Sequence, residues 1–238
     1  MAQPQMTFRR YEIKYLISRI QQLRILDAMA SFMEEDPWGK STICNIYFDT
    51  PDYRLVRHSQ EKPVYKEKLR VRSYGKASPN TAVFLELKKK YKSVVYKRRM
   101  NLPECVASSY LQGSGALPDS QIAREIDYFV NFYSGLRPTV QISYDRSAYF
   151  GKEDPGFRVT FDSNILWRDH DLSLCSGVYG SPLLNRDQVL MEIKTGGAIP
   201  LWMTALLTEM RIRKTSFSKY GRAYETLSEE MKGGRHYA

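Results

Sequence analysis

Alternating polar and apolar side chains predict a β-strand over residues 65–73, because alternate residues of a strand point to opposite faces. One face of this strand carries four cations about 6.6 Å apart: Lys66, Lys68, Arg70 and Arg72. Such a row repels itself unless an extended anion lies along it. The alternative is a solvated edge strand whose lysines prevent aggregation. The rest of the chain has to decide between these two interpretations.

The same alternation recurs along the chain, and turn-forming residues at 49–52 and 74–80 separate successive segments. At least five segments combine an apolar face with a face that contains Lys or Arg. This pattern predicts an α+β fold with one wide antiparallel sheet. The further predicted strands cover residues 7–17, 41–48, 83–90, 94–101, 139–150, 156–162, 164–168 and 189–195.

Apolar residues at helical spacing predict helices on either side of these strands. Ser18 is a suitable N-cap for a first helix, whose apolar positions continue to Met33 and which we expect to end before Pro37. Residues 103–119 contain Pro, Gly and Ser and predict a loop with one helical turn. No repeat or linker divides the chain, so we expect a single domain over residues 1–238. The other predicted helices cover residues 122–133, 201–210 and 218–231.

The polar faces of the predicted strands are rich in cations, with carboxylates among them. A sheet of this width tends to curl or close, and closure with the apolar face outward would turn the charged face into the lumen of a β-barrel tunnel. An excess of cations is tolerated there when an anion fills the lumen. Arginine and lysine suit phosphates, and carboxylates could hold a divalent metal. The face collects Lys14, Lys66, Lys68, Arg70, Arg72, Lys88, Lys97, Arg99, Arg146, Arg158 and Lys194, with Glu12, Glu86, Asp162 and Glu192.

Composition agrees with a polyanionic ligand. The 238 residues include 36 Lys and Arg against 26 Asp and Glu, a net charge of +10. Nucleic acid, an anionic membrane and phosphates are all compatible with this surplus. Nucleic acid is the weakest candidate, because no aromatic stacking platform interleaves the basic residues.

Cysteine usage and hydropathy predict a cytoplasmic protein. The three cysteines, Cys44, Cys105 and Cys175, lack metal-type spacing and fit a reducing compartment. No window approaches 18 apolar residues, so we expect no membrane span. The first six residues lack the apolar core of a signal peptide.

Seven short motifs, taken in order, resemble the VTC domain, the polyphosphate polymerase domain of the vacuolar transporter chaperone family. This family lies within the triphosphate tunnel metalloenzyme (CYTH-like) superfamily. The resemblance covers residues 7–225 and implies an antiparallel β-tunnel with flanking helices that binds ATP or inorganic polyphosphate. The motifs are Arg10-x-Glu12-x-Lys14, Lys68-x-Arg70-x-Arg72, Phe84-x-Glu86-x-Lys88, Tyr144-x-Arg146, Arg158-x-Thr160-x-Asp162, Glu192-x-Lys194 and Ser218-Lys219-Tyr220.

The resemblance also implies site residues. It places the metal-binding glutamate at Glu192, where the alternative is an ion pair with a lysine. Glu12 and Glu86 either contact the metal, Mn²⁺ or Mg²⁺, or orient neighbouring lysines. Strand parity favours Lys97 over Arg98, although a register error of one residue would reverse that choice. We expect catalytic roles for Arg70, Arg72, Lys88, Arg146, Arg158 and Lys219, and substrate binding by Lys14, Lys68, Lys97, Arg99, Tyr144, Lys194 and Ser218.

One departure favours a particular branch of the superfamily. Its hydrolases and cyclases usually begin Glu-x-Glu-x-Lys, whereas this chain has Arg10 in the first position. A cation there removes a potential metal ligand and adds affinity for anions. The expected activity is therefore transfer of the terminal phosphoryl of ATP to polyphosphate.

Two other activities stay open at this point. These are metal-dependent hydrolysis of triphosphate or polyphosphate, and a non-catalytic polyphosphate- or nucleotide-binding module. Eukaryotic members of the family also carry a phosphate-sensing SPX domain and membrane spans, which we do not find in this sequence. The sequence leaves open whether a partner protein supplies the membrane function.

Overall fold

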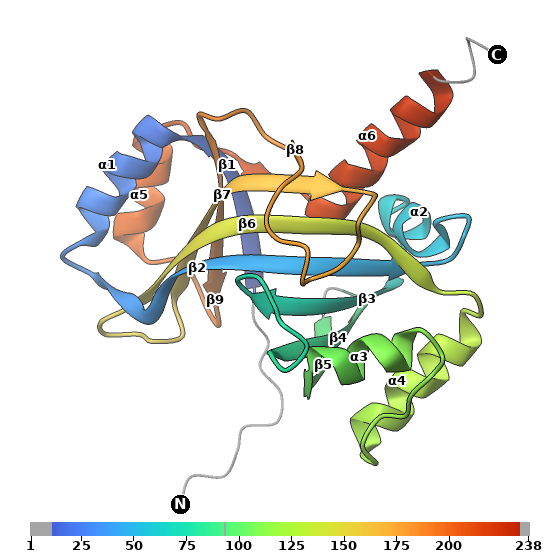
Figure 1. Ribbon diagram of the computed structural model, residues 1–238. Helices are drawn as coiled ribbons and strands as arrows, with labels where there is room; N and C mark the ends of the chain where they lie inside the picture. The colour runs from blue at the N-terminus through green and yellow to red at the C-terminus, as the bar shows by residue number, and fades with distance from the viewer. Residues whose placement is uncertain (1–10, 93, 234–238) are drawn as a thin grey trace, which may run out of the picture. The chain divides into compact units, whose positions relative to one another are not determined.

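A computed structural model describes residues 11–92 and 94–233, and Figure 1 shows the arrangement of their helices and strands. Arg10, the first residue of the N-terminal motif, lies outside the described residues. Within the described ranges, no helix is long and apolar enough to cross a membrane. The elements are β1 (Tyr11–Ser18), α1 (Arg19–Met29), β2 (Met33–Asp49), α2 (Arg54–Gln60), β3 (Tyr65–Tyr74), β4 (Ala82–Tyr91), β5 (Val94–Pro103), α3 (Glu104–Leu111), α4 (Gln121–Phe132), β6 (Arg137–Gly151), β7 (Arg158–Arg168), β8 (Ser181–Pro182), β9 (Gln188–Thr195), α5 (Leu201–Glu209), β10 (Lys214–Thr215) and α6 (Lys219–Gly233).

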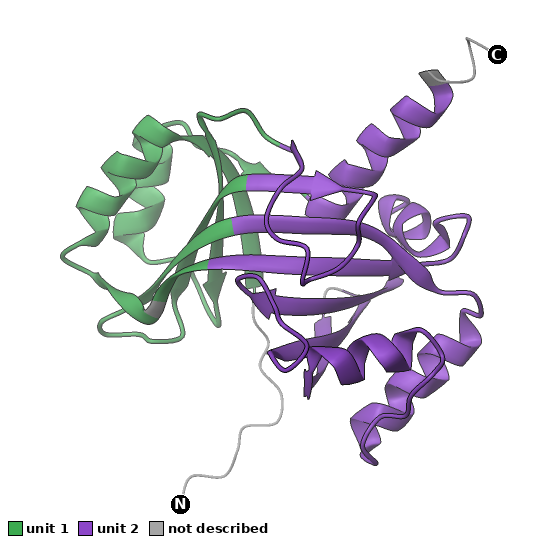
Figure 2. Ribbon diagram, in the orientation of Figure 1, with its two compact units in different colours: residues 1–41, 145–164, 184–217 green, residues 42–144, 165–183, 218–238 purple. Residues whose placement is uncertain are grey.

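The chain forms two compact units, which Figure 2 colours separately. Strands β2, β6 and β7 each have residues in both units. Unit 1 consists of the described residues within 1–41, 145–164 and 184–217, and unit 2 of those within 42–144, 165–183 and 218–238.

Unit 1 pairs β10, β1, β9 and the first part of β7 as antiparallel neighbours. The apolar parity of these strands, for example Tyr15, Met191 and Phe161, forms a core with residues of α1 and α5. Ile25 and Met203 are the fully buried contributions of those two helices. The charged residues lie on the opposite face of the strands.

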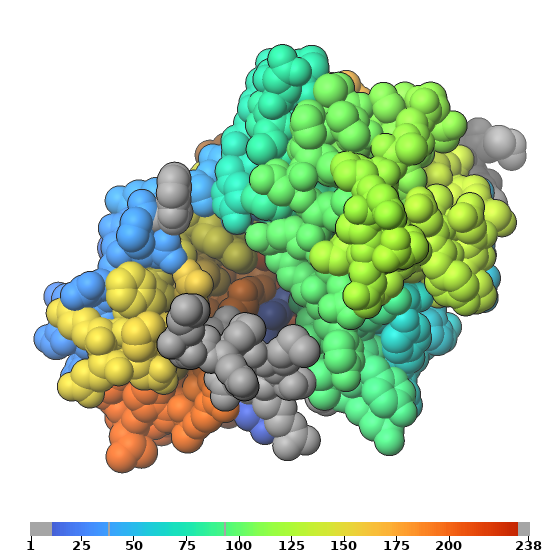
Figure 3. Space-filling view, turned by 90° about the horizontal axis from the view of Figure 1, so that it is seen from below, coloured from blue at the N-terminus to red at the C-terminus, as the bar shows by residue number. Residues whose placement is uncertain are grey.

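Unit 2 contains the neighbouring strands β6, β2, β3, β4 and β5. Leu69, Leu85 and Leu87 are fully buried on one face, where they pack with residues of α2, α3 and α4 such as Phe129. The side chains of β5, α3 and α4 form the green surface of this unit in Figure 3. The predicted site cations of β3, β4 and β5 take the other face.

The predicted antiparallel sheet with flanking helices is confirmed. Hydrogen bonds connect the described strands in the order β10-β1-β9-β7-β6-β2-β3-β4-β5, with β8 on β7. This order ends at β10 and β5, so strand pairing within the described residues does not close the barrel that we expected.

Several element boundaries differ from those predicted. Ser18 does cap α1 through a capping box with Gln21, but the helix ends at Met29. Met33 instead begins β2, where it is buried in the unit 1 core, so tertiary packing overrides the helical spacing. Residues 158–168 form the single strand β7 where we expected two strands, over 156–162 and 164–168, and α3 makes two turns where we expected one. Helix α2 was not predicted.

Candidate functional site

Cross-strand pairing in unit 2 places the predicted basic residues on one face of β3, β4 and β5. The opposite parity, which includes Leu69 and Leu87, belongs to the core. Arg98 also has that parity and donates to Glu125 of α4 at 2.8 Å, so the choice of Lys97 over Arg98 agrees with the register. The two rows of partners on the charged face are Lys68–Lys88–Lys97 and Arg70–Glu86–Arg99.

Glu86 is the centre of this charged face. Its side chain is only 1% exposed, and one oxygen, Oε2, accepts from Arg70 at 2.7 Å. The other, Oε1, lies 2.6 Å from the Lys97 ammonium and accepts from Arg99 at 2.6 Å. Burial would raise the pKa of Glu86, but Arg70, Arg72 and Lys97 hold it well below its usual value. Both oxygens thus form close ion pairs of 2.5–2.7 Å, which favours the orienting role of Glu86 over a metal contact.

Arg72 is held by neutral acceptors. It is 7% exposed and donates to Asn45 Oδ1 at 2.9 Å and to the Tyr144 hydroxyl at 3.3 Å. The Asn45 amide donates in turn to the carbonyl oxygen of Ile142. These hydrogen bonds fix the guanidinium without neutralising it, so its charge can act on a bound anion.

The start of α6 adds the C-terminal motif to the same unit. Ser218 Oγ accepts from the Gly221 amide at 3.2 Å, which makes Ser218 the N-cap of α6. Lys68 donates to the same hydroxyl at 3.2 Å, and the Lys219 ammonium lies 4.3 Å from the centre of the Tyr144 ring. The structure therefore brings these four predicted residues together.

Sequence reasoning missed Tyr47, which pairs with Arg70 on the charged face. Its hydroxyl accepts from Arg70 at 3.2 Å, and its ring stacks on Tyr220 at 4.7 Å. Burial would raise the pKa of Tyr47, but Arg70, Lys68 and Arg72 lower it to about 8. Continuing the alternation of β3 into its neighbour β2 would have placed Tyr47 and Asn45 on this face.

Asp49 was also missed, because we predicted a turn without chemistry there. It is fully buried and accepts hydrogen bonds from the amides of Leu55 and Val56, which stabilises the start of α2. Its Oδ2 also accepts from the Tyr220 hydroxyl at 2.8 Å. Asp49 thereby anchors the residue that follows Lys219 in α6.

In unit 1, the cation–carboxylate pairs surround Glu192. This carboxylate is 6% exposed and lies 3.2 Å from Lys14 and 3.7 Å from Arg146 and Lys194. Asp162 holds Arg146 through two hydrogen bonds of 2.6 and 2.7 Å. The rows on this face are Lys14–Glu192–Thr160 and Glu12–Lys194–Arg158, and Arg158 is paired with Asp36.

A divalent metal fits Glu192 only with ligands from the substrate. The described residues contain no group of three or more His, Cys, Asp or Glu side chains placed to hold a metal ion. Mg²⁺ is commonly held by one or two carboxylates together with substrate phosphates. Glu192 fits such a shared site. Glu12 lies 3.5 Å from the same Lys14 and is a further candidate.

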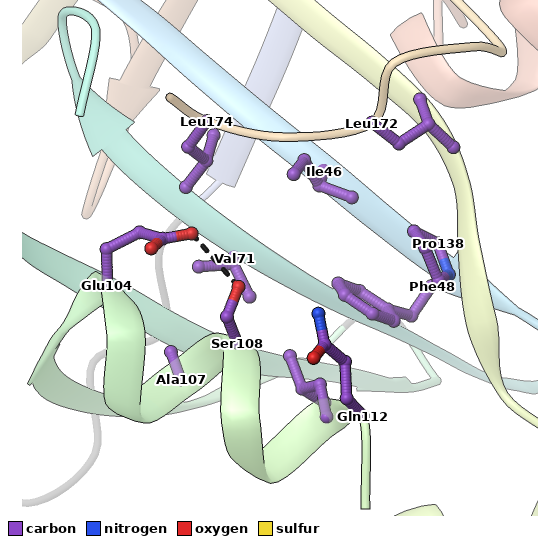
Figure 4. A pocket seen from close by; sticks show the side chains of 11 residues that line it. Ile46, Phe48, Val71, Glu104, Ala107, Ser108, Gln112, Pro138, Leu172 and Leu174 are labelled. Carbon is purple, nitrogen blue, oxygen red and sulfur yellow. Dashed lines mark hydrogen bonds between the residues drawn. The ribbon is translucent and has the colours of Figure 1, made fainter. Parts of the chain in front are cut away.

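Two cavities in unit 2 contain none of the predicted site residues. A small one of about 70 Å³ lies between the apolar face of β2 and β3 and helix α3, where Phe48 and Val71 line it and Ser108 donates to Glu104 (Figure 4). A larger one of about 350 Å³ lies between α2 and β3, where Lys66 donates to the Ser59 carbonyl. Lys66 is therefore apart from the inner cations of its strand.

Two solved structures have a fold similar to that of this chain. An adenylate cyclase-like protein of Bacillus halodurans is 15% identical, with a TM-score of 0.55 over 87% of this chain and 92% of its own. An adenylyl cyclase-like protein of Hippeastrum with a dominant triphosphatase activity is 19% identical, with a TM-score of 0.53 over 88% and 92%. At these identities the likeness shows a shared fold.

The chain belongs to the VTC domain family, whose model matches residues 9–228. A curated relative, vacuolar transporter chaperone complex subunit 4 of Schizosaccharomyces pombe, is 24% identical over 177 residues, 65% of this chain. The match spans only 24% of the length of that relative.

Proposed function

We propose that this protein is a polyphosphate polymerase-type phosphotransferase, which moves the terminal phosphoryl of ATP onto inorganic polyphosphate. Family membership and fold support the coarser class, an enzyme of phosphoryl transfer or triphosphate cleavage. The charged face of unit 2 carries the proposal, because three of its seven predicted cations, Arg70, Lys97 and Arg99, share one carboxylate, Glu86. A repetitive polyanion is the ligand that such a face would stabilise. The cations are Lys68, Arg70, Arg72, Lys88, Lys97, Arg99 and Lys219.

The reaction needs alignment and charge neutralisation more than a nucleophile from the protein. An oxygen at the end of the polyphosphate attacks the γ-phosphorus of ATP, the bond to the bridging oxygen breaks, and ADP leaves. Arg70 and Arg72 hold phosphate oxygens, and Arg146 and Lys14 neutralise the oxygens near Glu192. A divalent cation at Glu192, Mn²⁺ or Mg²⁺, would supply further neutralisation of the transferred group. No strong general base is required, since the attacking phosphate is already ionised.

Hydrolysis of triphosphate or polyphosphate is the second candidate. The structural likeness to the Hippeastrum protein, which has a dominant triphosphatase activity, favours it. Water would then replace the polyphosphate acceptor, and the same cations would hold the substrate. A binding module without turnover is the third candidate, because the unit 2 face could bind a polyanion on its own.

Incubation of the protein with ATP and Mn²⁺, with and without a short polyphosphate primer, tests the proposal. Long chains together with stoichiometric ADP would support the polymerase. Orthophosphate without chain growth would overturn it in favour of the hydrolase. Tight polyphosphate binding without turnover would overturn it in favour of the module. Magnesium in place of manganese identifies the preferred metal.

The setting of the reaction is also a proposal. We infer action in the cytoplasm from cysteine usage, which fits a reducing compartment. The relative in Schizosaccharomyces pombe is named as a subunit of a vacuolar transporter chaperone complex, which favours a partner protein at a membrane. Co-purification of the tagged protein from membrane and soluble fractions distinguishes an associated protein from an independent one.

A further inference from the structure

Thr160 occupies a position on the charged face of unit 1 that the predicted site did not use. It lies on β7 directly opposite Glu192 of β9, and paired residues of neighbouring strands point to the same face. Its neighbours Val159 and Phe161 point the other way, into the unit 1 core. Thr160 therefore lies on the same face as Glu192 and the cations around it.

The Thr160 hydroxyl has no hydrogen-bond partner among the residues that the structure describes. Thr160 is 6% exposed, and its Oγ1 is the one buried side-chain polar atom within the described residues for which no partner is found. A buried hydroxyl without a partner destabilises the folded protein, whereas an apolar group of the same shape does not. A hydroxyl at this position is thus unfavourable for the ligand-free protein and becomes favourable when a ligand reaches it.

The charges of unit 1 indicate what that ligand is. The four cations on this face, Lys14, Arg146, Arg158 and Lys194, accompany four carboxylates. A face with balanced charge gains little from a polyanion alone but accepts one that arrives with a divalent cation. A hydroxyl adds a ligand for that cation without adding charge. A hydroxyl and a carboxylate also hold Mg²⁺ beside phosphates in P-loop enzymes.

We propose that Thr160 Oγ1 and Glu192 together bind the divalent cation that accompanies the substrate phosphates. This inference rests on the proposed function, because it assigns a second protein ligand to the metal of that same site. It explains how a metal is held where the described residues offer no cluster of three acidic or imidazole ligands.

The test measures the affinity of the whole protein for imidotriphosphate, whose bridging nitrogens resist cleavage, with Mn²⁺ and with EDTA. The dissociation constant in EDTA divided by the dissociation constant with Mn²⁺ reports the contribution of the metal. Thr160→Val should lower this ratio about tenfold and leave the dissociation constant in EDTA unchanged. Thr160→Ser, which keeps the hydroxyl, should retain the ratio of the parent.

Thermal unfolding without ligand supplies the second readout. Thr160→Val should raise the melting temperature by about 3 °C, because it removes an unsatisfied buried hydroxyl. The same substitution at Thr139 is the matched control. That hydroxyl is buried but donates to the Tyr47 carbonyl at 3.0 Å and lies 3.0 Å from the Tyr220 hydroxyl, so Thr139→Val should lower the melting temperature.

Three outcomes would overturn the inference. An unchanged Mn²⁺ ratio in Thr160→Val, with a lowered ratio in Glu192→Gln, removes Thr160 from the metal site and leaves the proposed function intact. A weaker affinity of Thr160→Val for imidotriphosphate in EDTA would show that the hydroxyl donates to phosphate instead. A ratio that neither substitution changes removes the metal from this position, whereas the proposed function fails only if the primed assay with ATP shows no chain growth.

Discussion

The charged faces of the two units differ in how their cations are neutralised. In unit 2, Glu86 is the carboxylate that Arg70, Lys97 and Arg99 share, and Arg72 is held by neutral groups. In unit 1, each cation of the predicted set is paired with a carboxylate, as Arg146 is with Asp162. A surplus of cations favours a polyanion directly, whereas a balanced set favours one only together with an added cation. From this difference we propose that unit 2 binds the polyanion and that unit 1 carries the metal-dependent chemistry.

Substitution of Glu86 should have the largest effect, and on stability. Glu86→Gln leaves Arg70, Lys97 and Arg99 without their shared carboxylate, so we expect a loss of about 3 kcal/mol in the free energy of unfolding. Denaturant titration measures this loss. The same cations should then bind polyphosphate more tightly than in the parent. Glu125→Gln, which breaks the partly exposed pair with Arg98, is the control and should cost less than about 1 kcal/mol.

Removal of an arginine from each unit tests the division of roles. Arg70→Ala should weaken metal-free polyphosphate binding about 30-fold, the equivalent of about 2 kcal/mol for hydrogen bonds to a charged group. Arg146→Ala should weaken metal-free binding less than about threefold, because its charge is already balanced by Asp162. Isothermal titration in EDTA checks both. Equal losses in the two variants would abolish the distinction between the units.

The affinity for polyphosphate should fall about tenfold between pH 7 and pH 9, because two side chains of unit 2 titrate in this range. Burial lowers the pKa of Lys97 to about 8 against the opposing effect of Glu86, so its charge is lost as the pH rises through this value. The pKa of Tyr47 is also about 8, so this side chain becomes an anion over the same range. Both changes disfavour a polyanion. A Lys97→Arg, Tyr47→Phe double variant should bind polyphosphate with little pH dependence. If this variant kept the pH profile of the parent, the two side chains would be excluded as the cause of the pH dependence.

The smallest effect concerns the anchoring of α6. Tyr220→Phe removes the hydrogen bond to Asp49, so we expect a loss of about 1 kcal/mol in stability and a few-fold weaker binding through Ser218 and Lys219. Tyr224→Phe on the same helix is the control, because the Tyr224 ring packs against Tyr53 and would be kept. Binding by Tyr220→Phe that equals the parent's would remove Asp49 from the support of this site.

Much of the fold could be predicted because it follows local patterns. Strand alternation identified the charged parity of β3, β4 and β5 and, with it, the grouping of Arg70, Glu86 and Arg99. The antiparallel fold with flanking helices and the family also followed, once the spaced motifs were read together. These features depend on which face a side chain takes, and the period of two determines that face.

Features that depend on distant partners could not be predicted. Helix α2 begins where Asp49 accepts hydrogen bonds from the amides of Leu55 and Val56, and the composition of residues 54–60 does not reveal these contacts. The role of Glu86 as the shared partner of three cations needed the register of two strand pairs. The unsatisfied hydroxyl of Thr160 is visible only when every buried neighbour is known. The roles assigned to individual site residues stay predictions.

The most direct test of the division between the units combines two measurements on Glu192→Gln. We expect metal-free polyphosphate affinity to stay within about threefold of the parent, because unit 2 supplies that binding. Metal-dependent turnover of ATP should fall by at least about a hundredfold, because the metal is no longer held. Turnover equal to that of the parent, or loss of metal-free binding together with turnover, would contradict the division.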